Sequence, residues 1–197
     1  MCRFKSGIIL KSKCVVAPGE NDRHSDLLDE LGIKDDHLGA TQKFVRAELI
    51  PPKDEWWTDP DTWTMVVDQD IVPDWFTDDK EKYISDFKAS IKEWWKKHVL
   101  VDQKIEELSN GYYRLKRCEV KRLLNDVKVL LDSSQVGEMW DSSQVRVMRN
   151  SSQVGEMWGS SQVREMWDSS TAKDAEKQIL YVSNDSKLKI QIHENKG

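Results

Sequence analysis

Residues 132–167 read DSSQVGEMW DSSQVRVMR NSSQVGEMW GSSQVREMW, four nearly identical nine-residue units in tandem. A partial copy, DSST, follows at 168–171. Repeats of fixed length that share one apolar pattern, here V-x-x-M, are typical of solenoids, in which each coil packs on its neighbours. The array therefore decides the fold of the second half of the chain.

A single amphipathic helix does not fit this array. Nine residues at about 100° each make two and a half helical turns, so Val and Met of successive copies would point to opposite sides. Each copy also begins with turn-forming residues, Ser-Ser preceded by Asp, Asn or Gly. We predict β-coils with Val136, Met139 and Ser134 inside and Gln135 outside, together with their equivalents.

Two details of the repeats extend this prediction. The residue after Val alternates between Gly and Arg, a period of 18 that predicts two repeats per coil: Gly137, Arg146, Gly155 and Arg164. Degenerate copies of the apolar spacing flank the array: Val120 with Leu123, Val127 with Leu130, and Ala172 with Ala175. We expect a Trp ladder at the coil corners: Trp140, Trp158 and Trp167.

The predicted fold class is an α+β N-terminal domain followed by a small β-solenoid with a C-terminal β-hairpin cap. We place the α+β domain at 1–110, the solenoid at 111–175 and the capping hairpin at 176–197. Strands are predicted in RFKSGIIL, KCVV, KFVRAELIPP and WTMVVDQ, and helices in HSDLLDELG and at about 79–98. After these we expect a strand, a short turn or helix ending at Gly111, and another strand.

The cap is predicted from the last part of the chain. ILYVS and LKIQIHE flank NDSK, which is a hairpin signal. Such a hairpin would cover the open edge of the last coil, whose backbone groups would otherwise pair with any passing strand.

Composition limits the function classes. The net charge of -5 and the pI near 5.5 argue against a generic nucleic-acid binder, which needs clustered Lys and Arg. The three cysteines are odd in number and unpaired in spacing, so neither a disulfide framework nor a zinc site is predicted. No stretch is apolar enough to span a membrane or to act as a signal peptide. We expect a protein of the bacterial cytoplasm with no membrane partner.

The segments MCRFKSGIIL, FVRAELIPP, VDQDIVPDWF and GYYRLKRCEVKRL, followed by SSQVxEM copies, resemble an uncharacterised protein family of gut bacteria and their phages. The resemblance covers nearly the whole chain and implies a genomic context, not an activity. The array also resembles, more loosely, pentapeptide-repeat solenoids, whose coils can imitate DNA. Its repeat length departs from five.

Residues 54–79 are rich in acids and Trp and contain no Lys or Arg. Clustered carboxylates steer a basic surface and Trp side chains anchor interfaces, so this stretch predicts a binding site for a protein partner. Its residues would be Asp54, Glu55, Trp56, Trp57, Asp59, Asp61, Asp74, Asp78 and Asp79. The alternative, in which the Trp residues are core, has equal weight for Trp56 and Trp57 and is favoured for Trp63 and Trp75.

One basic strip lies at the junction with the array. It is a candidate anion-binding site formed by Arg114, Lys116, Arg117, Lys121 and Arg122. Such a strip would bind nucleic acid, or would neutralise the acidic region of a second copy and give a homo-oligomer through the solenoid.

Catalytic signals are weak. Cys2 would become an N-terminal nucleophile if Met1 were removed, but the supporting signatures are not recognisable. Cys14 or Cys118 paired with a His belongs to no motif, and the Asp pairs at 59–61 and 68–70 lack the features of calcium loops. We therefore predict no catalytic residue, no metal and no cofactor.

The leading hypothesis is a non-enzymatic interaction protein. In its sharpest form it is a phage-encoded anti-defence inhibitor, such as an anti-CRISPR protein, that occupies the basic groove of a host nuclease. The alternatives are an N-terminal-nucleophile hydrolase using Cys2, and a nucleic-acid-binding or self-assembling scaffold.

Overall fold

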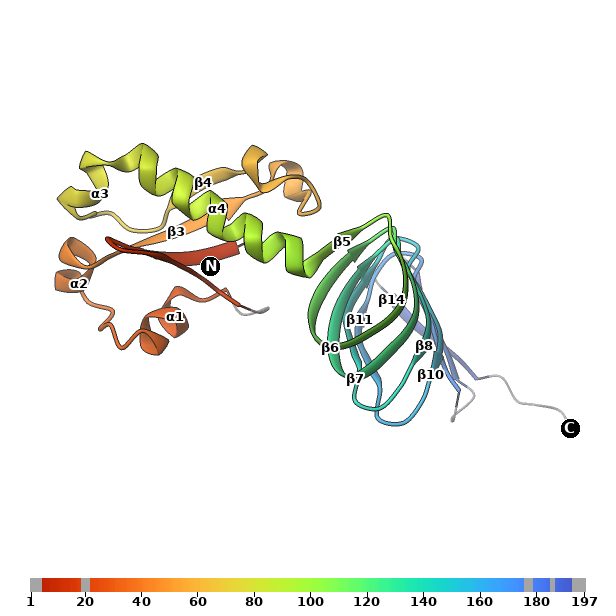
Figure 1. Ribbon diagram of the computed structural model, residues 1–197. Coiled ribbons are helices and arrows are strands. Elements are labelled where there is room, and N and C mark those ends of the chain that lie inside the picture. Colours follow the sequence, from red (N-terminus) through yellow and green to blue (C-terminus); the bar gives the residue numbers. More distant parts are fainter. Residues whose placement is uncertain (1–4, 19–21, 176–178, 185–186, 193–197) are drawn as a thin grey trace, which may run out of the picture. The chain divides into compact units, whose positions relative to one another are not determined.

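The computed structural model describes residues 5–18, 22–175, 179–184 and 187–192. The chain divides into two compact units, Met1–Lys96 and Lys97–Gly197. Figure 1 shows a mixed sheet-and-helix unit first and a stack of β-coils second. No helix among the described residues is long and apolar enough to cross a membrane.

The first unit contains a four-stranded sheet with the order β2-β1-β3-β4. Its strands are β1 (Lys5–Leu10), β2 (Cys14–Val16), β3 (Phe44–Ile50) and β4 (Thr64–Val67), and every pairing is antiparallel. Each strand was predicted from apolar residues bounded by turn or Pro signals. Alternation along β3 sends Phe44 into one cluster of buried residues and Val45 into another, so both faces are covered.

Helices cover the two faces of this sheet (Figure 1). The long helix α4 (Lys80–His98) packs Tyr83, Phe87 and Ile91 in the cluster of Val45. Helix α1 (His24–Glu30) places Leu27 and Leu28 in the cluster of Phe44. Shorter elements complete the unit: α2 (His37–Gln42), η1 (Pro52–Asp54), η2 (Pro60–Thr62) and α3 (Asp74–Asp78).

The second unit is a parallel β-solenoid of about five turns. Its strands are β5 (Val99–Val101), β6 (Lys104–Lys116), β7 (Glu119–Asp132), β8 (Gln135–Met139), β9 (Gln144–Arg149), β10 (Gln153–Met157), β11 (Gln162–Met166) and β12 (Thr171–Asp174). One face stacks β6, β7, β8, β10 and β12, and the other stacks β6, β7, β9 and β11.

The predicted two repeats per coil are confirmed. Gln153 pairs with Gln135 and Gln162 pairs with Gln144, so successive rungs on a face lie 18 residues apart (153 − 135). The Val and Met ladders are internal, and the third residue of the copy is fully buried at Ser134, Ser143, Ser152 and Ser170. In the fourth copy Ser161, Val163 and Met166 are half-buried. Gln135 points to solvent, as predicted.

The first residue of most copies explains the choice of Asp, Asn or Gly there. Asp141, Asn150, Gly159 and Asp168 have φ angles of 56°, 58°, 64° and 56°. This left-handed conformation is tolerated by Gly, and better by Asn and Asp than by most other residues, which favours these types at the turn. Ser133 and Arg117 adopt the same conformation at earlier turns, with φ of 50° and 52°.

One degenerate copy was assigned to the wrong residues. Val120 and Leu123 do pair with Val136 and Met139. On the opposite face, however, Val129 and Leu131 align with Val145 and Met148, instead of Val127 and Leu130. A register shift in β7 beside Val129 moves the apolar positions, and spacing alone does not reveal such a shift.

The coils also begin earlier in the chain than residue 111. Val99 of β5 already pairs in parallel with Arg114. The turn or helix expected to end at Gly111 is instead part of β6, which bends at Asn110 and Gly111, where φ is 62° and 86°. The Asn-Gly pair thus marks a bend within a strand.

The C-terminal strands are β13 (Ile179–Asn184) and β14 (Lys187–Ile192). They pair antiparallel with each other, and β13 pairs antiparallel with β12. The middle of the predicted turn, at 185–186, lies outside the described residues.

Candidate functional site

The exposed cations of the basic strip are paired with carboxylates one coil away. Arg117 contacts Asp102 through two nitrogens at 2.6 and 2.7 Å, and this guanidinium lowers the pKa of Asp102. Lys121 Nζ lies 3.0 Å from Oε2 of Glu106. Arg122 Nη2 lies 3.5 Å from Oε2 of Glu107, the residue that follows Glu106. The side chains that would have met phosphates are therefore engaged within the solenoid.

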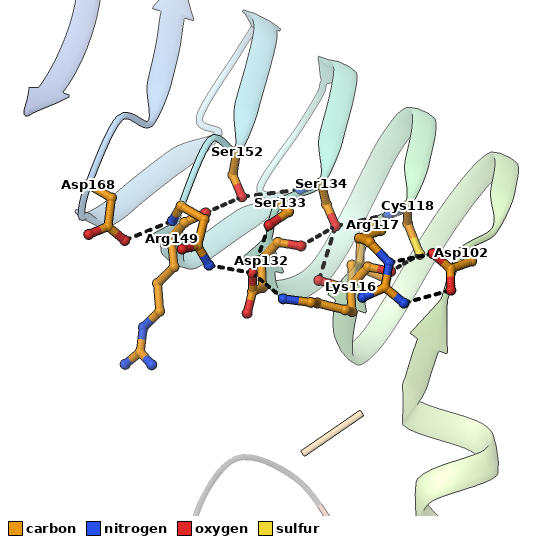
Figure 2. Close-up of polar contacts among 12 residues, drawn as sticks. Asp102, Lys116, Arg117, Cys118, Asp132, Ser133, Ser134, Arg149, Ser152 and Asp168 are labelled. Carbon is orange, nitrogen blue, oxygen red and sulfur yellow. Dashed lines mark hydrogen bonds and ion pairs between the residues drawn. The ribbon is translucent and has the colours of Figure 1, made fainter. Parts of the chain in front are cut away.

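Lys116, which was also predicted to belong to the strip, is buried. Its Nζ lies 2.8 Å from Oδ1 of Asp132, which is also buried. The same carboxylate oxygen accepts hydrogen bonds from Asn150 and Ser133, and Figure 2 shows these contacts at one corner of the coils. Arg114, the fifth, donates from Nε to the Tyr112 hydroxyl at 3.0 Å.

A column of serine hydroxyls runs beside this ion pair (Figure 2). The Cys118 N–H donates to Ser134 Oγ at 3.1 Å, and the Ser134 N–H donates to Ser152 Oγ at 3.3 Å. Each hydroxyl also donates to a carbonyl, Ser134 to that of Leu115 and Ser152 to that of Arg149. Ser134 and Ser152 therefore satisfy backbone groups between coils, which is a structural role, whereas the Ser143 hydroxyl has no hydrogen-bond partner among the described residues.

The aromatic part of the predicted protein-binding site lies mostly in the interior. Trp56 is 7% exposed, and its carbonyl accepts a hydrogen bond from the Trp95 indole at 2.9 Å. Trp57 is half-buried and meets Trp56 edge to face. Trp63 is buried, and Trp75 is half-buried with its indole N–H donating to the Gln42 carbonyl.

The acids of the same stretch fall into two groups. Asp59 and Asp61 both contact Lys92, and the Asp61 N–H together with Lys92 lowers the pKa of Asp59. A second group is exposed and has no ion pair among the described residues: Asp54, Asp74, Asp78 and Asp79. Glu55 is half-buried. Negative charge that is available to a partner thus gathers on and beside α3.

The sequence did not predict an acidic hollow of about 560 Å³ in the first unit. Its walls include Asp68 and Asp70 after β4, Asp35 and Asp36 before α2, and Arg46 of β3, which pairs with Asp35. Ile71, also in the wall, is 46% exposed, as are Val66 at 41% and Leu38 at 60% close by in the sequence. No motif signals this hollow because its walls come from distant segments.

The hollow borders a group of residues that can hold a metal ion. His24, Glu48 and Asp68 each offer one ligand atom, and these atoms lie within 4.8 Å of one another. His24 and Glu48 are buried, whereas Asp68 also lines the hollow. No spacing along the chain signals this group, because its members lie on α1, on β3 and directly after β4.

The thiols of Cys14 and Cys118 are poorly suited to nucleophilic catalysis. Burial raises the pKa of Cys14 to about 11. Burial also raises the pKa of Cys118, whose Sγ lies 3.2 Å from the Leu100 carbonyl oxygen. Both thiols are therefore protonated at neutral pH, and a protonated thiol is a poor nucleophile. Cys2 lies outside the described residues.

No known protein family, curated protein or solved structure matches the chain. The function is therefore argued from the chain's own geometry.

Proposed function

We propose that the chain is a non-enzymatic interaction protein that binds a basic partner protein through the acidic hollow and the exposed carboxylates of α3. The observation that carries this proposal is a contrast between the two units. The cations of the solenoid's basic strip have partners, whereas Asp70, Asp74 and Asp78 are exposed and have no ion pair among the described residues.

The shape of the hollow supports a protein as the partner. It is large enough for one long cationic side chain, and Asp70, whose carboxylate is not used in an ion pair among the described residues, would pair with such a side chain. Exposed Ile71 and Val66 supply apolar area beside the acids. Interfaces of this kind combine an apolar centre with charges that steer the approach of the partner. The binding surface thus lies at the hollow and α3, and the indoles of Trp56 and Trp63 stay inside.

The sharpest form of the proposal is a phage-encoded inhibitor in the bacterial cytoplasm that occupies the basic groove of a defence nuclease. Its support is the charge of the first unit. Nucleases present basic grooves to phosphates, and a surface of fixed carboxylates can occupy such a groove.

The test is affinity capture from a bacterial lysate with the tagged full chain, followed by mass spectrometry. A variant with Asp70, Asp74 and Asp78 changed to Asn removes the available charge from exposed positions. A matched variant changes Asp59 and Asp61 to Asn, because these acids are exposed but paired with Lys92.

The proposal expects a basic protein that is captured by the wild type and by the matched variant and is lost from the first variant and at about 0.5 M salt. It also expects the purified chain to inhibit that protein if it is a nuclease. Equal capture by all three chains, or capture of acidic proteins only, would contradict it.

Self-assembly is a second candidate, favoured by indoles on the solenoid surface. Trp140 and Trp158 stack with centroids 5.4 Å apart and planes 11° apart, which confirms the predicted ladder for these two residues. Trp140 is 38% exposed. Trp167, which directly follows β11 on the other face of the solenoid, is 44% exposed. A homo-oligomer would bury these rings, so sedimentation of wild type and Trp140→Ser tests this candidate.

We further propose that β13 and β14 cap the solenoid. The pairing of β13 with β12 supports a cap, because it occupies the edge of that strand. A chain ending at residue 175 should then expose this edge and aggregate, whereas an unchanged monomer would contradict capping.

A further inference from the structure

The ring of His24 is held so that one nitrogen must carry hydrogen. Its Nε2 lies 3.1 Å from the carbonyl oxygen of Ala47 in the buried interior. A carbonyl oxygen only accepts hydrogen bonds, so Nε2 is the donor in this contact. In the neutral ring, Nδ1 is then the bare nitrogen and presents a lone pair.

That bare nitrogen faces carboxylates. Nδ1 lies 3.3 Å from Oδ2 of Asp68, and a carboxylate oxygen of Glu48 completes a group within 4.8 Å. A neutral imidazole nitrogen and two carboxylates are all acceptors, so no hydrogen lies between them. A metal ion at their centre would accept all three lone pairs at once.

A second observation points to the same place. Ser6 of β1 is directly opposite Glu48 of β3 in the antiparallel register, so the two side chains leave the same face of the sheet. Ser6 is fully buried, and its hydroxyl has no hydrogen-bond partner among the described residues. Buried hydroxyls nearly always have a partner, and a bound ion or its water would supply one.

We propose that His24, Glu48 and Asp68 bind one divalent transition-metal ion, with Zn²⁺ as the favoured occupant. Zn²⁺ takes imidazole nitrogen and carboxylate oxygen at about 2.0–2.2 Å, and two such ligands lie about 3.0–3.5 Å apart around the ion. The contact between His24 and Asp68 falls in this range. The Ala47 carbonyl accepts a hydrogen bond from the other ring nitrogen and so orients the imidazole, as the hydrogen-bond partners of metal-binding histidines usually do.

The three residues give the ion a path from solvent. Asp68 has a side chain that is 58% exposed and lines the acidic hollow, whereas His24 and Glu48 close the site from beneath. Three protein ligands leave a fourth position that faces the hollow or the Ser6 hydroxyl, and water would fill it. The negative walls of the hollow raise the local concentration of cations.

The experiment is a calorimetric titration of Zn²⁺ into the full chain after treatment with a chelator. A Cys2→Ser background removes the one thiol whose surroundings are not described. The proposal expects one Zn²⁺ per chain, confirmed by native mass spectrometry, weaker binding of Mn²⁺, and no measurable binding of Mg²⁺.

The decisive variant is Asp68→Asn, because this exposed residue can change without disturbing the core. It should weaken Zn²⁺ binding at least about tenfold, as should Glu48→Gln, whereas His98→Gln at the end of α4 is the matched control and should leave it unchanged. Absence of a stoichiometric site, or equal affinity in Asp68→Asn and the control, would overturn the proposal. Since no partner is present in this titration, its failure is separate from failure of the proposed function.

Discussion

A Cβ atom added to Gly155 would lie 2.5 Å from the carbonyl oxygen of Gly137, the residue beneath it on the preceding coil. Gly137 has the same relationship to the Lys121 carbonyl, at 2.7 Å. The equivalent positions on the other face carry Arg146 and Arg164, where a side chain is accepted. Within the near-identical repeats Gly therefore falls on the face of β8 and β10 and Arg on the face of β9 and β11, while Lys121 occupies the equivalent position on the first of these faces one coil earlier.

This close approach predicts a difference between faces. Gly155→Ala should destabilise the solenoid by about 1–3 kcal/mol, because the backbone of the neighbouring coil must shift to admit a methyl group. Arg164→Ala, at the same repeat position on the other face, should change stability by less than about 0.5 kcal/mol. Urea unfolding of both variants measures the contrast, and equal effects would refute the two-repeat coil.

Breaking the buried ion pair of Lys116 with Asp132 should lower the free energy of unfolding more than breaking an exposed pair. Lys116→Met leaves the Asp132 carboxylate buried without its cation, and such a loss costs about 3–5 kcal/mol. Lys121→Met removes an exposed pair with Glu106 and should cost no more than about 1 kcal/mol. The measurement is the same denaturant series. Similar values for the two variants would show that the buried pair is not special.

The hydrogen bond from the Ser134 N–H to Ser152 Oγ explains the serine at the third position of that repeat. Ser152→Ala leaves the buried Ser134 N–H without its acceptor, at a cost of about 1–3 kcal/mol. Ser151→Ala, one residue earlier and exposed, serves as the control and should be nearly neutral. Hydrogen exchange of the Ser134 amide should quicken only in the first variant.

The pKa of Cys14 predicts the pH dependence of its reactivity. The pKa of about 11 in the folded chain lies above the ordinary 9.0. Alkylation of Cys14 by iodoacetamide, followed by peptide mass spectrometry, should therefore be slow at pH 8 and should rise only as the pH approaches 11. Between pH 9 and 11 the unfolded chain loses this proton before the folded chain does, so stability falls as the pH rises. Fast alkylation at pH 8 in native protein would contradict the burial of this thiol.

Periodic features of the sequence predicted the fold well, and contacts between distant residues escaped it. The 18-residue period and the buried Val136, Met139 and Ser134 follow from the repeat, because each coil copies its neighbour's environment. Helix α2 was missed because HLGATQ is short and has little apolar periodicity. The bend at Gly111 imitated a helix end.

The candidate site was predicted less well, for a physical reason. Counting charges in the sequence cannot show that Arg117 and Lys121 form ion pairs with Asp102 and Glu106, because the length of a coil determines which residues face each other. The exposure of Trp56 also depends on tertiary packing against Trp95. The hollow and the group around His24 combine residues from several elements, and the sequence carries no local sign of them.

In the proposed function, the first unit recognises the partner and the repeats serve as scaffold. Removing residues 141–158 deletes two repeats and keeps the Gly and Arg faces in register, whereas removing 150–158 deletes one and places Arg164 over Gly137. The first deletion should fold, and the second should be destabilised.

The most direct measurement is the lysate capture repeated with the chain that lacks 141–158. The account predicts that this chain retains the same basic protein as the full chain, and that changing Asp70, Asp74 and Asp78 to Asn abolishes capture in both. Loss of capture on deleting the two repeats, with capture unaffected by the Asn changes, would contradict it and would place recognition on the solenoid.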